Sequence, residues 1–208
     1  MSRQEQRGQT RARLIEAASS IMGRDGLLAA RTADIAEEAG VAHGTVFTHF
    51  PTREDLLCAV IGELGSRLAS RLHVLAEGGR ELRGILEAHL AALSENEALY
   101  ARLVAEGRSL PESARMSVVA IQSAISFHLG IVVERGTREG ELRPMPLHLL
   151  FNTWIGLIHH YLANGDLFAP DGDSVLLKFG DELLDHFCSL VGRSGDVEPR
   201  GKGAVHGD

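Results

Sequence analysis

Residues 32–56 have the sequence TADIAEEAGVAHGTVFTHFPTREDL, and this stretch decides the fold. Two short segments, residues 32–39 and 43–50, place apolar side chains at helical spacing on either side of Gly40. The glycine gives the backbone the freedom that a turn requires, and Pro51 ends the second segment. Two short helices joined by a tight turn are typical of a helix-turn-helix.

The flanking residues complete a three-helix unit. Upstream, residues 11–22 carry an apolar face at three-to-four spacing, which predicts an amphipathic helix. Downstream, Thr52 opens a longer helix with a sequence that resembles a capping box. Residues 1–52 are therefore predicted to form an N-terminal helix-turn-helix domain.

The second short helix is expected to have two different faces. Val46 and Phe50, with Val41 before them, are spaced to pack against the first helix. The opposite face carries short hydrogen-bonding side chains without negative charge: His43, Thr45, Thr48 and His49. A helix that enters the major groove of DNA needs such a face. Gly44, at the start of the helix, leaves the backbone open to a phosphate.

Helical periodicity continues through the rest of the chain without strand-like alternation, so an all-α fold is predicted. The further helices are expected at about residues 52–75, 80–93, 94–107, 111–139, 147–163 and 175–191, which makes about nine helices in all. Ser94-Glu-Asn-Glu97 predicts a capping box at the start of one of them. Residues 53–192 would form one helical domain. The glycine-rich, charged residues 193–208 are predicted to be disordered.

Charge is unevenly distributed along the chain, whose net charge is −7. Residues 1–53 hold seven arginines against six acidic residues, a balance of +1, so the remainder has a balance of −8. This charge distribution suits a protein in which only the N-terminal part binds phosphate groups.

Composition also indicates where the protein works. The longest apolar candidate, residues 147–162, is interrupted by polar side chains and falls short of the roughly 20 residues of a membrane span. The N-terminus has no apolar segment of the secretory type. Cys58 and Cys188 lie far apart. We therefore expect a cytoplasmic protein with no membrane partner.

The order T-x-D-I-A-x-x-A-G-V-x-x-G-T-V-F-x-H-F-P-T-R-E-D-L resembles the signature of the tetracycline-repressor family of transcriptional regulators. The resemblance implies a homodimer that binds a double-stranded DNA operator with palindromic half-sites and leaves it when a small-molecule effector binds. Thr32 would cap the second helix and touch a phosphate. By position, His43, Gly44, Thr45 and Thr48 would face base edges or nearby backbone, and Phe47, His49 and Arg53 would line phosphates.

The family resemblance further implies that the last two helices dimerise. Their apolar side chains exceed what one core face needs: Leu149, Leu150, Trp154, Leu157, Ile158, Tyr161, Val175, Leu176, Phe179, Leu183, Leu184, Phe187 and Leu190. Gly156 and Gly180 would permit close approach of helices. The alternative is that these residues are simply the core of the monomer.

The effector would bind among the helices between the DNA-binding domain and the dimer bundle. Candidate residues are polar or aromatic side chains within apolar helices: His89, Tyr100, His128, Asn152, Trp154 and His159. For any one of them, an ordinary role in the core or on the surface is more common than contact with a ligand. The ten histidines have no metal-ligand spacing, so no metal, cofactor or catalytic residue is predicted.

Two other functions remain open from the sequence. A transcriptional activator of the same fold would have the same sequence features, because the position of the operator decides the sign of regulation. An all-helical, metal-dependent enzyme is suggested by the histidines alone. For the repressor, we expect the effector to change the tilt of the helix that begins at Thr52, since no flexible linker separates the two domains.

Overall fold

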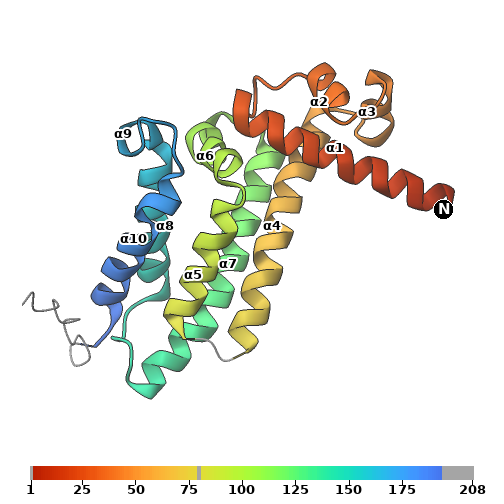
Figure 1. The fold of residues 1–208 in the computed structure, drawn as a ribbon. Coiled ribbons are helices and arrows are strands. Elements are labelled where there is room, and N and C mark those ends of the chain that lie inside the picture. Colours follow the sequence, from red (N-terminus) through yellow and green to blue (C-terminus); the bar gives the residue numbers. More distant parts are fainter. Residues whose placement is uncertain (1, 79–80, 194–208) are drawn as a thin grey trace, which may run out of the picture.

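A computed structural model describes residues 2–78 and 81–193, and within these ranges the chain is helical (Figure 1). All nine predicted helices are present there, together with the short α9, which the sequence did not predict, and a 3-10 turn, η1. The helices are α1 Arg3–Asp25, α2 Thr32–Glu38, α3 His43–His49, α4 Arg53–Glu77, α5 Leu82–Ser94, α6 Glu97–Glu106, η1 Gly107–Ser109, α7 Glu112–Glu139, α8 Leu147–Ala163, α9 Gly165–Phe168 and α10 Val175–Val191.

Helices α1 to α3 form the head of the molecule, at one end of the long helices (Figure 1). Helix α1 is longer than the predicted residues 11–22, because Ser2 and Glu5 form a capping box that starts it near the N-terminus. It ends at Gly26, whose φ of 105° is unfavourable for other residues.

The turn between α2 and α3 has the geometry that the sequence predicts. Gly40 has a φ of 64°, and the Val41 amide donates to the Ala36 carbonyl at 2.9 Å. Arg13 of α1 fastens the turn by donating to the Ala39 carbonyl. Val46 is buried against the head core, as expected of the inner face of α3.

Helices α4 to α10 form the body, and α4 runs into it directly from the head (Figure 1). Its first turn is a capping box in which the Asp55 amide donates to Thr52 Oγ1 at 3.0 Å and the Thr52 amide to the Asp55 carboxylate at 2.9 Å. Helix α4 packs along α7, where Gly65 lies against Ile121. Only the short turn of residues 50–52 therefore separates α3 of the head from α4 of the body.

The capping box predicted at Ser94–Glu97 is wrong. Ser94 is the last residue of α5 and donates to the Leu90 carbonyl, and Asn96 precedes α6 without a side-chain cap. Glu97 instead caps another helix, since its carboxylate accepts from the amides of Val175 and Leu176 at 2.7 and 3.2 Å at the start of α10. A local motif cannot reveal a partner that is distant in the sequence.

Most apolar side chains assigned to dimerisation are core residues of the monomer. The buried ones are Leu150, Trp154, Ile158, Val175, Leu176, Leu183, Leu184 and Phe187. Gly180 is buried and its Cα lies close to Leu90 of the same chain, whereas Gly156 is exposed with open space beside it. Of the predicted set, Leu149 is 54% and Leu190 46% exposed, while Leu157, Tyr161 and Phe179 are half-buried.

Helix α7 exposes more apolar surface than the sequence indicated. Residues 116–133 contain no charged side chain, and among the described residues α7 alone is long and apolar enough to cross a membrane, judged by length and composition only. Length and composition are weak evidence for a membrane span, because core helices of soluble proteins pass the same test. Four of its apolar side chains are exposed: Met116, Val119, Phe127 and Ile131. Of the tail predicted to be disordered, residues 193–208, all but Arg193 lie outside the described residues.

Candidate nucleic-acid interface and ligand cleft

Helix α3 turns a polar face to solvent. His43, Gly44 and Thr48 are exposed, and Phe47 is 43% exposed beside His43, with a ring-centroid separation of 5.3 Å. No side chain or backbone atom lies within 4 Å of the position that a Cβ of Gly44 would take, so the backbone there is open. Thr45 is half-buried at the edge of this face. Four of the predicted DNA-contacting residues of α3 are thus exposed, whereas His49, like Thr45, is half-buried.

Thr32 does not cap α2 as predicted, whereas its contact with a phosphate stays a prediction. Arg31, not Thr32, occupies the N-cap position of α2, and no side chain caps this helix. The Thr32 hydroxyl lies 3.0 Å from His43 Nε2 instead, which joins the start of α2 to the start of α3. The contact fixes the His43 ring at the exposed end of the recognition helix.

Arg53 is partly engaged within the protein. Its Nη2 donates to the Leu27 carbonyl at 2.9 Å, which holds the loop after α1 against the start of α4. The remaining guanidinium donors stay available for the predicted phosphate contact, since Arg53 as a whole is exposed.

Two arginines of α1 extend the surface of α3 and were not among the predicted site residues. Burial lowers the pKa of His49, and the charges of Arg7 and Arg11 lower it further, so both guanidinium groups lie near the end of α3. Arg11 also lies 5.0 Å from the centroid of the Phe50 ring. The spacing of residues 3, 7 and 11 was a usable signal, because side chains four residues apart share one face of a helix.

A cavity of about 400 Å³, the apolar cleft, lies between α6, η1, α7 and α8. Its lining residues are Tyr100, Leu103, Val104, Gly107, Arg108, Arg115, Val118, Val119, Ile121, Gln122 and His159. Of the predicted ligand residues, Tyr100 and His159 are brought together here, with Tyr100 Oη 2.9 Å from His159 Nε2. The volume is in the range of small-molecule sites, which are mostly apolar with a few polar groups.

His89 and Trp154 form a second pair in the core. Trp154 Nε1 donates to His89 Nδ1 at 3.0 Å, and the two residues are 1% and 0% exposed. Burial lowers the pKa of His89 to about 4, with a smaller effect from nearby His159. His89 is therefore neutral at pH 7 and carries its proton on Nε2, which has no hydrogen-bond partner in the described part of the chain.

The other two predicted ligand residues lie elsewhere. His128 is buried on α7 with its ring 5.2 Å from that of His73 on α4, and burial followed by the charge of His73 lowers its pKa. Asn152 is exposed on α8 and does not line the apolar cleft. Sequence reasoning missed Arg108, Arg115 and Gln122, which line the cleft but are ordinary surface residues in the sequence pattern.

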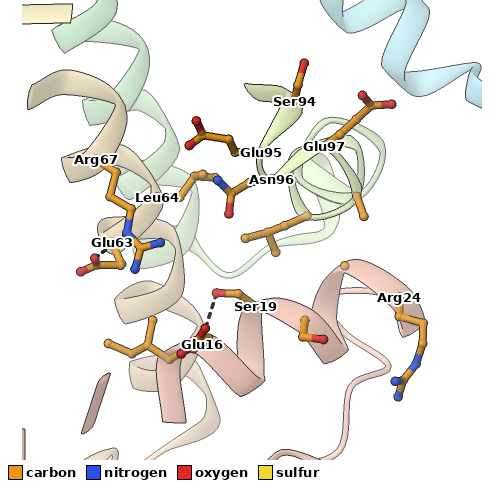
Figure 2. A pocket seen from close by; sticks show the side chains of 15 residues that line it. Glu16, Ser19, Arg24, Glu63, Leu64, Arg67, Ser94, Glu95, Asn96 and Glu97 are labelled. Carbon is orange, nitrogen blue, oxygen red and sulfur yellow. Dashed lines mark hydrogen bonds and ion pairs between the residues drawn. The ribbon is translucent and has the colours of Figure 1, made fainter. Parts of the chain in front are cut away.

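A second hollow, the joint cleft, has about 790 Å³ and lies where the head meets the body (Figure 2). Figure 2 shows Glu16 and Ser19 of α1 facing Glu63 and Arg67 of α4 and the segment between α5 and α6. Arg67 pairs with Glu63 at 2.8 Å. Its charged lining makes the joint cleft a poor match to an apolar effector site. Within residues 2–78 and 81–193, no group of three or more potential ligand side chains could hold a metal ion.

Comparisons with known proteins agree with this arrangement. Residues 14–60 match the model of bacterial regulatory proteins of the tetR family. An HTH-type transcriptional repressor of Mycobacterium tuberculosis is 37% identical over 67 residues, a match that spans 32% of this chain and only 36% of that relative. The repressor KstR2 of the same species is 25% identical over 170 residues, which cover 76% of this chain and 84% of KstR2.

Solved structures share the fold over nearly the whole length. The transcriptional regulator FadR from Bacillus subtilis in complex with stearoyl-CoA has a TM-score of 0.72 at 20% identity, covering 86% of this chain and 97% of FadR. A TetR-family regulator from Agrobacterium tumefaciens has a TM-score of 0.74 at 18% identity, covering 90% and 100%. The helix-turn-helix head thus matches the tetR family by sequence over residues 14–60, and the helical body shares the fold of solved TetR-family structures, so the chain is similar to TetR-like helix-turn-helix regulators.

Proposed function

We propose that this protein is a sequence-specific, DNA-binding transcriptional repressor that a small-molecule effector releases from its operator. The observation that carries the proposal is the exposed face of α3 with His43, Phe47 and Thr48, together with Arg7 and Arg11 of α1 near His49 at the end of the same helix. Such a face can enter the major groove while neighbouring guanidinium groups bind phosphates. Relatives that are named as repressors support the same function.

The proposed partner is a palindromic DNA operator, bound by a homodimer in the cytoplasm. One head makes few contacts with DNA, so specific affinity needs two heads on half-sites about 34–36 Å apart. The exposed apolar side chains of α7 and α8, including Phe127 at 66% and Leu149 at 54%, offer a surface for the second copy. The exposed Gly156 of α8, which has open space beside it, would permit close approach of a helix of the second copy.

The proposed effector site is the apolar cleft. It has mainly apolar walls and a single internal polar pair, Tyr100 and His159. The FadR structure with stearoyl-CoA is a precedent for an acyl ligand in a protein of this fold. Occupation of the cleft would change how the heads are held and so change their separation.

DNA binding tests the proposal directly. Purified protein is titrated into DNA from beside its own gene and into scrambled DNA of equal length, over a series of salt concentrations. We expect a preference of several kcal/mol, about 4 or more, for the native DNA, and weaker binding as salt rises. Equal affinity for both DNAs, repeated with genome-wide fragments and with refolded protein, would exclude a sequence-specific regulator.

A matched pair of variants tests the surface. Thr48→Glu places a negative charge on the exposed face of α3, and we expect it to weaken operator binding at least about tenfold through repulsion of phosphate. Ser66→Glu makes the same kind of change on the exposed side of α4 and should leave binding unchanged.

The activator alternative is tested by transcription of a reporter gene. The position of the operator determines whether the bound protein lowers or raises that transcription.

A further inference from the structure

Two arginines stand at the apolar cleft without a carboxylate to balance them. Arg108 belongs to η1 and Arg115 to the first turns of α7; both are exposed, and no acidic residue is among the residues that line the cleft. Neither takes part in an ion pair within the described ranges of the chain, and Arg115 donates only to the Leu110 carbonyl, at 3.2 Å. This positive spot lies on a body that is otherwise strongly acidic.

The more buried polar residues of the cleft are unsuited to binding a charge. Tyr100 and His159 already bond to each other, and His89, whose pKa the nearby His159 affects, is almost completely buried together with Trp154. Burial raises the pKa of Tyr100 and lowers that of His159, so both are neutral at pH 7. A ligand with one charge would therefore direct its apolar part inward and its charged group toward the arginines, because an unpaired buried charge is costly.

The segment that carries Arg108 also forms hydrogen bonds with the head. Two residues earlier, the Glu106 carboxylate accepts from the amides of Leu27 and Leu28, each at 3.2 Å, in the loop that follows α1. One turn before that, Arg102 Nη2 donates to the Arg24 carbonyl at 3.1 Å. The end of α6 thus contacts the head on one side and, through Leu103 and Arg108, the apolar cleft on the other.

We propose that the effector is an amphiphilic anion whose charged group is held by Arg108 and Arg115 and whose apolar part fills the cleft, and that its binding reaches the head through Arg102 and Glu106. The inference rests on the proposed function and adds the chemical class of the effector and the route of its action. Guanidinium groups bind carboxylates and phosphates with paired hydrogen bonds, which fits either anion. A cavity of about 400 Å³ has room for on the order of a dozen water-sized groups, which matches a medium-length chain.

Four ten-carbon probes test the class of ligand: decanoate, decanoyl-CoA, decanol and decyltrimethylammonium. Binding to the wild-type protein is measured by calorimetry and by the fluorescence of Trp154, the single tryptophan. We expect one or both anions to bind, and decanol and the cation to bind at least about tenfold more weakly, because they lack the charge-assisted hydrogen bonds. The two anions distinguish a free carboxylate from a phosphate-bearing thioester. Equal binding of decanol, preference for the cation, or no binding of any probe would overturn the proposal.

Variants then test the residues. Arg108→Gln combined with Arg115→Gln should weaken the anion that binds at least about tenfold, while Arg138→Gln, the same change near the other end of α7, should leave it unchanged. An unchanged affinity in the double variant would overturn the assignment. Calorimetry does not involve DNA, so this result stands apart from success or failure of the operator test.

The route to the head has its own pair of variants. Glu106→Ala removes both hydrogen bonds to the loop after α1 but does not alter the lining of the cleft. We expect this variant to bind the anion like the wild type and to lose most of its anion-induced release from DNA. Glu95→Ala removes an exposed partner of Arg71 nearby and should keep the release intact. If Glu106→Ala released DNA as the wild type does, transmission through α6 would be wrong.

Discussion

Because His89 is buried and neutral, it is expected to make the free energy of unfolding depend on pH. Its folded-state pKa is about 4, lowered mainly by burial, whereas an unfolded histidine has a pKa of about 6.5. As pH falls through this interval the unfolded chain gains a proton that the folded chain does not, so the free energy of unfolding decreases. Between pH 7 and pH 4.5 this one residue should remove on the order of 2 kcal/mol.

The test is His89→Gln, which keeps an acceptor for Trp154 but does not titrate. Urea unfolding at pH 7 and pH 4.5 should show a smaller loss of stability in the variant than in the wild type. Some loss persists, because burial also lowers the pKa of His159 and His128. An identical loss in both proteins would mean that His89 is not the buried neutral group described above.

At the scale of helices, α1 is expected to act together with α3 on DNA. The Arg7 guanidinium lies near the end of α3, where its charge adds to the effect of burial in lowering the pKa of His49. If Arg7 binds a phosphate, Arg7→Gln should weaken binding to all DNA sequences alike and reduce the salt dependence by about one phosphate contact per protomer. Arg24→Gln, at the other end of α1 and paired with Asp25, serves as the control. A loss confined to the operator would instead indicate contact with bases.

The elements of the head were predictable because their signals are local. A glycine turn, a proline stop and two short apolar patterns lie within residues 32–52, and each is satisfied by neighbours in the sequence. The start of α6 was not predictable in the same way. Glu97 follows Ser94 at capping-box spacing, but its carboxylate serves the amides of Val175 and Leu176, far along the chain.

The same limit applies to the candidate sites. The exposed face of α3 follows from periodicity alone, whereas the apolar cleft depends on how three helices and a turn meet. Tyr100 and His159 were predicted because aromatic and polar groups stand out in apolar helices. Arg108 and Arg115 were missed because a surface arginine beside a cavity has the same sequence pattern as one in open solvent.

For the whole molecule, the apolar surface that remains on one protomer indicates how two would meet. Most apolar side chains of α8 and α10 are used in the monomer core, so a dimer of these helices needs other contacts. Phe127 and Ile131 of α7 and Leu149 of α8 are large, apolar and exposed. Surfaces of this kind are characteristic of protein–protein contacts.

We therefore expect Phe127→Glu combined with Leu149→Glu to convert a dimer into monomers, because each copy would bring two charges into an apolar interface. Analytical ultracentrifugation gives the mass, and circular dichroism checks that the helices persist. Val74→Glu, a change of similar kind at a 68% exposed position of α4, should leave the dimer intact. Monomers should also lose specific operator affinity, since a single head cannot span two half-sites. A fully dimeric double variant would exclude this surface from the interface and direct attention to the polar faces of α8 and α10.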